Sequence, residues 1–148
     1  MPNDRINRTS KKEHLEAMTI KEELRGTAGT GQWVGFDLDG TLAHYDRWRG
    51  PNHIGAPIPE MIDLIKAYIE ANVEVHIFTA RACDPIQVPV VERFCERHIG
   101  RVLQVTNVKD FGMRLLYDDR AIQIVPNTGR SVKEQLIRAG WVPPEHLT

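Results

Sequence analysis

The stretch "VGFDLDGTLA", Val34 to Ala43, decides the fold class of this chain. An apolar run leads into two aspartates, Asp37 and Asp39, which are followed at once by a Gly-Thr pair. Apolar β-branched and aromatic residues bounded by such polar residues predict a buried strand over "WVGFDL", residues 33–38. The two carboxylates therefore fall at the carboxyl end of a strand that is buried.

The segments that follow alternate between helix and strand patterns. Apolar residues recur at helical spacing in the two segments that begin at Pro59 and Asp84, and runs rich in β-branched residues separate them. Strands that alternate with helices of this length predict an α/β fold, with helices on both faces of a parallel sheet. The predicted helices span residues 59–72 and 84–100, and the predicted strands span residues 33–38, 73–79, 101–108, 114–119 and 121–125.

Capping-box patterns near Ser10 and Ser131 predict a short first helix and a last helix at the two ends of the sequence. The glycine-rich stretch at residues 26–32 lacks the Gly-Lys-Ser/Thr of a phosphate-binding loop, so it is interpreted as a flexible linker. We expect an N-terminal helix and linker over residues 1–32 and one α/β domain over residues 33–148.

The composition is that of an ordinary globular domain. The chain has 148 residues, 41% of them apolar and 26% charged, with a net charge of −1. This balance predicts no bulk attraction to nucleic acid or to an acidic membrane, and no apolar run approaches the ~20 residues of a membrane span. Without a signal-peptide pattern, Cys83 and Cys95 are interpreted as reduced packing residues in a cytoplasmic protein.

Polar residues stand at the carboxyl ends of four predicted strands, where ligands bind in parallel sheets. Two unit charges about 4 Å apart repel by about 4 kcal/mol at an effective dielectric constant near 20. Four clustered acids therefore need protonation, Lys109 or a bound dication, and an all-oxygen site of this kind suits Mg²⁺. The strand-end residues are Asp37, Asp39, Thr79, Asn107, Lys109, Asp118 and Asp119.

These residue types suit phosphoryl transfer. A carboxylate beside the metal can attack phosphorus, and the resulting aspartyl-phosphate divides one difficult displacement into two easier ones. A second carboxyl group, two residues further on, can act as general acid and then as general base. Thr79 can hold a phosphoryl oxygen, and Lys109 can balance the accumulated negative charge.

In this order the residues resemble the four motifs of the haloacid dehalogenase-like (HAD) superfamily of phosphohydrolases. The resemblance covers roughly residues 33–127. The second aspartate of the first motif is missing in the dehalogenases of that superfamily, so its presence here favours phosphoester chemistry. The matching motifs are "DLDGT" (residues 37–41), Thr79 of "FTAR", Lys109 of "TNVKD" and "LLYDD" (residues 115–119).

The resemblance implies a Rossmann-like, doubly wound parallel sheet with strand order 5-4-1-2-3. It implies that Asp37 is the nucleophile and a Mg²⁺ ligand. It also implies that Asp39 is the acid/base and binds the metal through its backbone carbonyl. Asp118 would be a direct metal ligand, and Asp119 would bind the metal through water or steady Lys109.

Family members often carry a cap domain, but here only a short loop, residues 43–57, separates the first motif from the first predicted helix. The chain thus resembles a capless member with an open site. The loop mixes arginines and aromatic residues that can bind phosphate and stack on a base. The expected substrate contacts are Gly40, Thr41, Ala80 and Arg81 at the rim, with Arg47 and Trp48 in the loop. A salt bridge to the sheet edge is an equal alternative for Arg81, and a packed flap is the alternative for the loop.

Three functions remain open. The leading one is a Mg²⁺-dependent phosphatase that acts on a phosphorylated small molecule or on a nucleotide or polynucleotide end, as a monomer or homodimer. A receiver-like phospho-switch would need an acid where the chain has Asn107. An inactive HAD-like binding module would not need the intact acids.

Overall fold

The computed structural model describes residues 19–131, and the chain divides into two compact units joined at the Tyr117–Asp118 bond. The capping box at Ser10 and the helix predicted to begin near Ser131 lie outside the described residues. Residues 19–24 are helical, and the helix ends before Gly26, as predicted. None of the helices within the described residues is long and apolar enough to cross a membrane.

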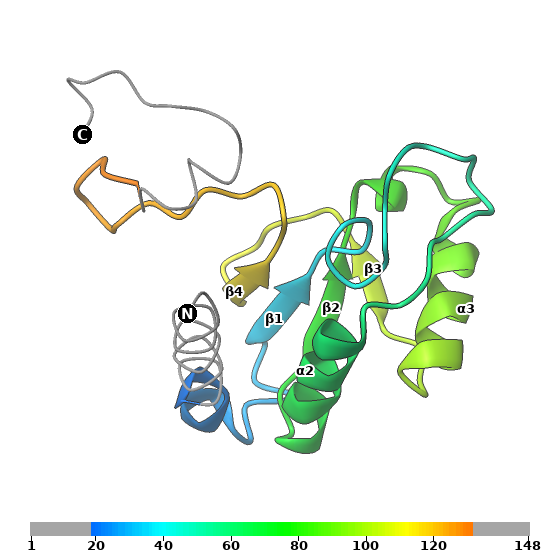
Figure 1. The fold of residues 1–148 in the computed structure, drawn as a ribbon. Helices are drawn as coiled ribbons and strands as arrows, with labels where there is room; N and C mark the ends of the chain where they lie inside the picture. The colour runs from blue at the N-terminus through cyan, green and yellow to red at the C-terminus, as the bar shows by residue number, and fades with distance from the viewer. Residues whose placement is uncertain (1–18, 132–148) are drawn as a thin grey trace, which may run out of the picture. The chain divides into compact units, whose positions relative to one another are not determined.

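Four parallel strands form the sheet of the first unit (Figure 1). Its strand order is β3-β2-β1-β4, which confirms an α/β fold built on a parallel sheet. The strands are β1 (Trp33–Phe36), β2 (Val75–Phe78), β3 (Gln104–Thr106) and β4 (Met113–Tyr117).

The strand predicted at residues 121–125 is not a fifth strand of this sheet in the described part of the chain. Ile124 instead forms an isolated antiparallel bridge with Ser131. The backbone between them reverses direction through two residues with positive φ, Asn127 at 64° and Gly129 at 69°. Only the 4-1-2-3 part of the predicted strand order is therefore seen.

The two predicted core helices are confirmed as α2 (Pro59–Glu70) and α3 (Val88–His98). Each has a proline in its first turn, where the missing N–H removes no helical hydrogen bond. A short 3₁₀ helix, η1 (Ala80–Cys83), precedes α3. In Figure 1, α2 lies in front of β2 and α3 lies beside β3. Right-handed crossovers that step the same way across the sheet place both helices on one face, so α2 and α3 do not confirm the prediction of helices on both faces.

The core is formed where α2 and α3 pack against the sheet. All four residues of β1 are buried, as expected for a strand with neighbours on both sides. Tyr68 of α2 is fully buried, and its hydroxyl lies 2.7 Å from that of Tyr117. Phe36 stacks on the Tyr117 ring at 4.8 Å between ring centroids. Burial raises the pKa of both tyrosines, so the pair stays neutral and anchors β4 to the core.

The connection from β3 to β4 contains no helix. Asp110 Oδ1 accepts hydrogen bonds from Trp33 Nε1 and from the Gly112 backbone N–H, both at 2.8 Å. The Trp33 bond is the main cause of the lowered pKa of Asp110. A Cβ on Gly112 would lie 2.0 Å from the Gly31 carbonyl oxygen, so the close passage of the chain requires glycine. This passage brings β4 to the free edge of β1.

The stretch at residues 26–32 forms turns that are tied to the end of α2. The Gly26 N–H donates to the Ala71 carbonyl and the Ala28 N–H to that of Asn72, both at 2.9 Å. The prediction for the cysteines holds for one of them. Cys95 is buried in α3, and burial raises the pKa of its thiol to about 12. Cys83 is exposed at the end of η1, so it is not a packing residue.

Candidate functional site

A tight turn follows β1 and carries the first-motif residues. The Leu38 carbonyl accepts the N–H groups of residues 41, 42 and 43 at 3.0–3.2 Å, and Gly40 has a φ of 92° that favours glycine. The Asp37 N–H donates to the Tyr117 carbonyl at 2.9 Å. The buried Thr41 hydroxyl donates to Asp37 Oδ2 at 3.3 Å. Asp37 is thus held by its backbone and by one carboxylate oxygen.

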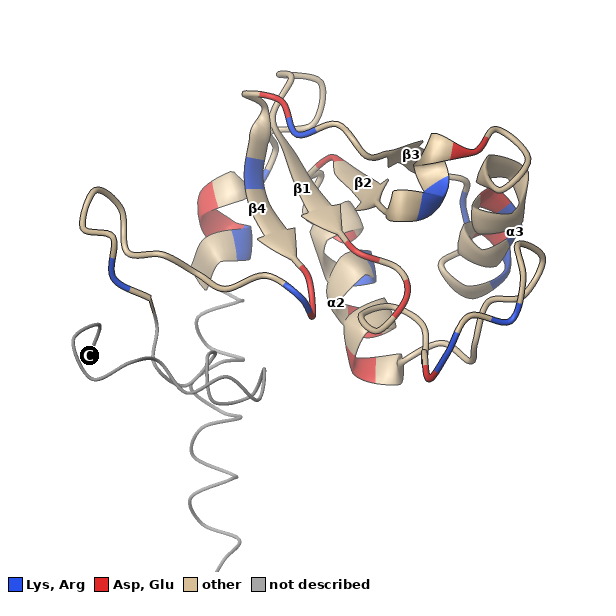
Figure 2. Ribbon diagram, turned by 90° about the horizontal axis from the view of Figure 1, so that it is seen from above, with Lys and Arg blue, Asp and Glu red and all other residues tan. Residues whose placement is uncertain are grey.

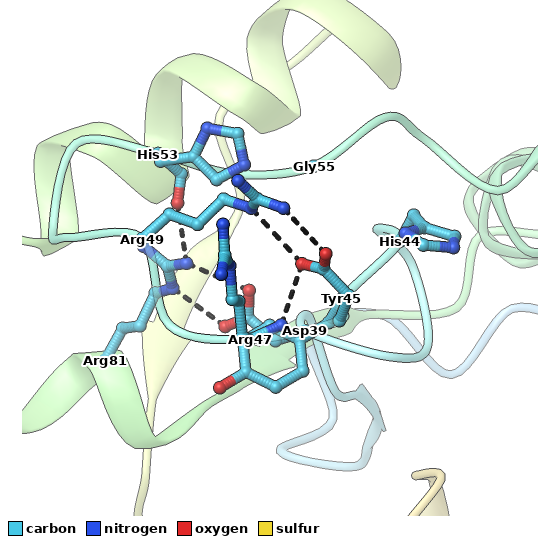
Figure 3. A pocket seen from close by; sticks show the side chains of 9 residues that line it. Asp39, His44, Tyr45, Arg47, Arg49, His53, Gly55 and Arg81 are labelled. Carbon is cyan, nitrogen blue, oxygen red and sulfur yellow. Dashed lines mark hydrogen bonds and ion pairs between the residues drawn. The ribbon is translucent and has the colours of Figure 1, made fainter.

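The side chain of Asp39 is paired with an arginine from another strand end. Arg81 Nε donates to Asp39 Oδ2 at 2.8 Å, and Arg81 Nη2 donates to Oδ1 at 2.9 Å (Figure 3). The Arg81 side chain is only 5% exposed and that of Asp39 is 21% exposed. Such a bidentate pair is both directional and strong. Arg81 thus forms an ion pair, but its partner lies in the turn after the central strand β1 and not at the sheet edge.

Arg81 also ties the 43–57 loop to the sheet. Its Nη1 donates to the Pro51 carbonyl at 3.3 Å, and its Nη2 donates to the His53 carbonyl at 2.8 Å. Its guanidinium carbon lies 5.0 Å from the centre of the Trp48 ring, within the range of a cation–π interaction. One buried side chain therefore links Asp39 to three places in the loop.

Thr79, at the end of β2, fixes the backbone that carries Arg81. Thr79 is buried, its N–H donates to the Thr106 carbonyl of β3 at 2.9 Å, and its hydroxyl accepts the Arg81 N–H at 3.2 Å. The hydroxyl thereby caps η1 in place of a helical carbonyl. Ala80, the first residue of η1, is exposed beside it.

A polar pocket lies between Asp39 and the loop. Asp46 and Arg49 form an exposed ion pair in its wall, with Nη2–Oδ2 at 2.7 Å. Hydrogen bonds from the Arg49 side chain and the Arg47 backbone N–H hold the pKa of Asp46 at about 2. Arg47 is exposed, and its guanidinium has no ion-pair partner among the described residues. The pocket is lined by Asp39, His44, Tyr45, Asp46, Arg47, Arg49, His53, Gly55 and Arg81.

The third-motif lysine follows β3, and the fourth-motif acids follow β4. Lys109 is exposed on the crossover between β3 and β4, and no ion pair joins it to another described residue. Asp118 and Asp119 follow β4 directly and begin the second unit. Asp118 Oδ1 accepts the Arg120 N–H at 2.8 Å. Figure 2 shows that the ribbon is acidic directly beyond both β1 and β4.

The structure thus brings together some of the residues predicted for the site. Asp39, Arg81 and Arg47 line one pocket, and Trp48 packs on Arg81 while remaining 53% exposed. Neither Asp46 nor Gly55, which both line the pocket, was named as a candidate from the sequence. The spacing of three residues between Asp46 and Arg49 was a usable signal for the ion pair. Gly55 carried no signal, because its need for glycine comes from the His44 carbonyl, which a Cβ would approach to 2.0 Å.

No protein-family model matches the chain, and no curated protein or solved structure matches it significantly. The function of this protein is therefore inferred from its residues and from the geometry around them.

Proposed function

We propose that this protein is a Mg²⁺-dependent phosphatase of the HAD-like class, which hydrolyses a phosphate monoester through an aspartyl-phosphate on Asp37. In this proposal the domain is a capless, doubly wound, Rossmann-like fold with strand order 5-4-1-2-3, of which the described residues show the 4-1-2-3 part. The observation that carries the proposal is the pairing of β1 with β4, which ends in register at Phe36 and Tyr117.

This register determines where the acids begin. Because the strands are parallel, the residues that follow Phe36 and Tyr117 leave the sheet at the same end. The hydrogen bond between the Asp37 N–H and the Tyr117 carbonyl marks that end. Asp118 is the next residue after Tyr117, so the fourth-motif acids start from the neighbouring strand end.

The donor set fits a hard dication. In the proposal, Asp37, Asp118 and Asp119 would supply the carboxylates that hold the metal, so all of these donors would be oxygen atoms. Oxygen ligands from few protein groups, with room for water and for a phosphate oxygen, are typical of Mg²⁺ sites. When bound, the cation would draw electron density from the phosphoryl oxygens and offset the negative charge of the acids. The Asp39 carbonyl would complete the protein ligands.

The protein's own groups would carry out the remaining steps. Asp37 is oriented by its backbone bond to the Tyr117 carbonyl and by the Thr41 hydroxyl, and its carboxylate would attack phosphorus. Attack forms the Asp37 Oδ–P bond and breaks the bond from phosphorus to the ester oxygen. Thr79 and Lys109 would hold phosphoryl oxygens.

Asp39 would act as the general acid and then as the general base. It gives a proton to the departing ester oxygen, and it then takes one from the water that hydrolyses the aspartyl-phosphate. Water attack returns Asp37 to a carboxylate and releases inorganic phosphate, so the enzyme is restored. The position of Asp39 two residues after the nucleophile supports this role.

One observation favours a second function. Both oxygens of Asp39 are occupied by Arg81, which also suits a protein that binds a phosphorylated partner without turning it over. In that case the acids would serve recognition and no phosphate would be released.

Phosphate release from a panel of phosphate esters, with Mg²⁺ or with EDTA, separates the two functions. We expect release with Mg²⁺ and none with EDTA. Asp37→Asn is nearly isosteric and removes the nucleophile, so kcat should fall by at least about 10³-fold. Asp63→Asn, an exposed position on α2, is the matched control and should keep wild-type activity. Release that persists in Asp37→Asn, or in EDTA, would refute the mechanism.

A further inference from the structure

The pocket is offset from the nucleophile. Of the two aspartates that follow β1, Asp39 lines it and Asp37 does not. A phosphate monoester positioned for attack by Asp37 directs its ester oxygen toward the acid that protonates it. The group beyond that oxygen must then extend past Asp39. The pocket is therefore where the leaving group of the proposed reaction would lie.

We propose that this pocket binds a nucleotide leaving group that carries a phosphate of its own, as in a polynucleotide end or a nucleoside bisphosphate. The inference rests on the proposed phosphatase function and adds the class of substrate. The charges, the position of Arg81 and the aromatic residues of the loop each support it.

The pocket has more cationic than anionic side chains. Three arginines and two aspartates line it, and two of the arginines are paired with the aspartates. The guanidinium that remains is that of Arg47, exposed and with no ion-pair partner in the described part of the chain. A guanidinium presents a planar set of donors that matches phosphate oxygens. Arg47 is thus the group that would bind the second phosphate.

Arg81 holds this part of the loop beside Asp39. Its guanidinium binds both Asp39 oxygens and the carbonyls of Pro51 and His53. The loop that carries Arg47 is therefore anchored next to Asp39, where the ester oxygen of the substrate would lie.

Aromatic residues of the loop favour a nucleotide among the anionic leaving groups. Tyr45 lines the pocket, and Trp48 is 53% exposed with Arg81 near the ring. Aromatic rings and arginine planes stack on bases with little regard to base identity. A sugar phosphate would bind the arginine but would leave the exposed surface of the Trp48 ring uncovered.

Calorimetric titration with the dinucleotide ApA tests the pocket without catalysis. ApA has one internal phosphodiester and no terminal phosphate, so a monoester phosphatase cannot consume it. The titrations use the full chain in EDTA, with adenosine as the uncharged comparison. The variants are Arg47→Ala and, as a matched control, Arg101→Ala, an exposed arginine at the start of the turn that leads into β3.

We expect ApA to bind the wild type at least about ten-fold more tightly than adenosine does, as for a charge-assisted phosphate contact. Arg47→Ala should weaken ApA binding by a similar factor, and Arg101→Ala should not. Equal binding of ApA and adenosine, no binding of ApA, or equal effects of the two variants would overturn the inference. Because no turnover is involved, phosphatase activity without ApA binding would refute the pocket alone, and the reverse result would refute the phosphatase alone.

Discussion

The contrast between two ion pairs gives a sharp test of the geometry around Asp39. In the ion pair between Arg81 and Asp39, the arginine side chain is only 5% exposed. In the ion pair between Arg49 and Asp46, the side chains are 41% and 54% exposed. The distances are nearly the same, 2.8 Å and 2.7 Å. A difference in the effect of arginine removal must therefore come from burial and from the further contacts of Arg81.

Removing one partner of a buried ion pair typically costs about 3–5 kcal/mol, because the other charge is left without compensation. Asp39 is 21% exposed, and water can partly solvate it after Arg81→Ala, which favours the lower end of that range. The two hydrogen bonds to the loop carbonyls are also lost. We expect Arg81→Ala to lower the free energy of unfolding by about 3 kcal/mol.

Urea unfolding at pH 7 in EDTA measures this loss without any contribution from metal binding. Arg49→Ala is the matched control and should be almost indistinguishable from the wild type, since exposed ion pairs contribute little. Hydrogen exchange should become faster in residues 44–55 of Arg81→Ala only. Equal unfolding midpoints for the two variants, or unchanged protection of residues 44–55, would refute the role assigned to Arg81.

Two further predictions concern the crossover and the loop. Gly112→Ala should destabilise the fold by about 3 kcal/mol in thermal or urea unfolding, because its Cβ meets the Gly31 carbonyl, and Gly35→Ala, which meets only side chains at 3.1 Å, should cost less. Nuclear magnetic resonance should find the pKa of Asp46 below its usual value of 3.8, and Arg49→Ala should raise it. Since the folded-state pKa is the lower one, the stability that Asp46 contributes is present above about pH 4 and is lost as the pH falls to about 2; an unshifted Asp46 would contradict the ion pair.

Local patterns were enough to predict most of the fold. Periodicity of the apolar residues placed α2 and β1–β4 within a few residues of their observed bounds, because each segment buries one face or both against the same core. The predicted fifth strand shows the limit of this reasoning. Its apolar residues suit a strand equally well in the sheet or in the local bridge to Ser131, and pattern alone does not choose the partner.

The candidate site was also only partly predictable from the sequence. Asp37, Asp39 and Thr79 were predicted to leave the sheet at one end, and the pairing of β1 with β2 places them there. The contacts of Arg81 were not predictable, because they join positions far apart in sequence: Asp39, and carbonyls whose place depends on the loop backbone.

The amino-acid sequence by itself determined the alternation of helices and strands and the acids at the strand ends, since both follow from short-range periodicity and residue type. Only the tertiary structure decided that Arg81 pairs with Asp39, that the 43–57 loop encloses a polar pocket, and that the Arg47 guanidinium has no ion-pair partner within residues 19–131. The physical reason is that hydrogen bonds and ion pairs form at about 3 Å between groups brought close by folding, and no spacing along the chain specifies which groups those are.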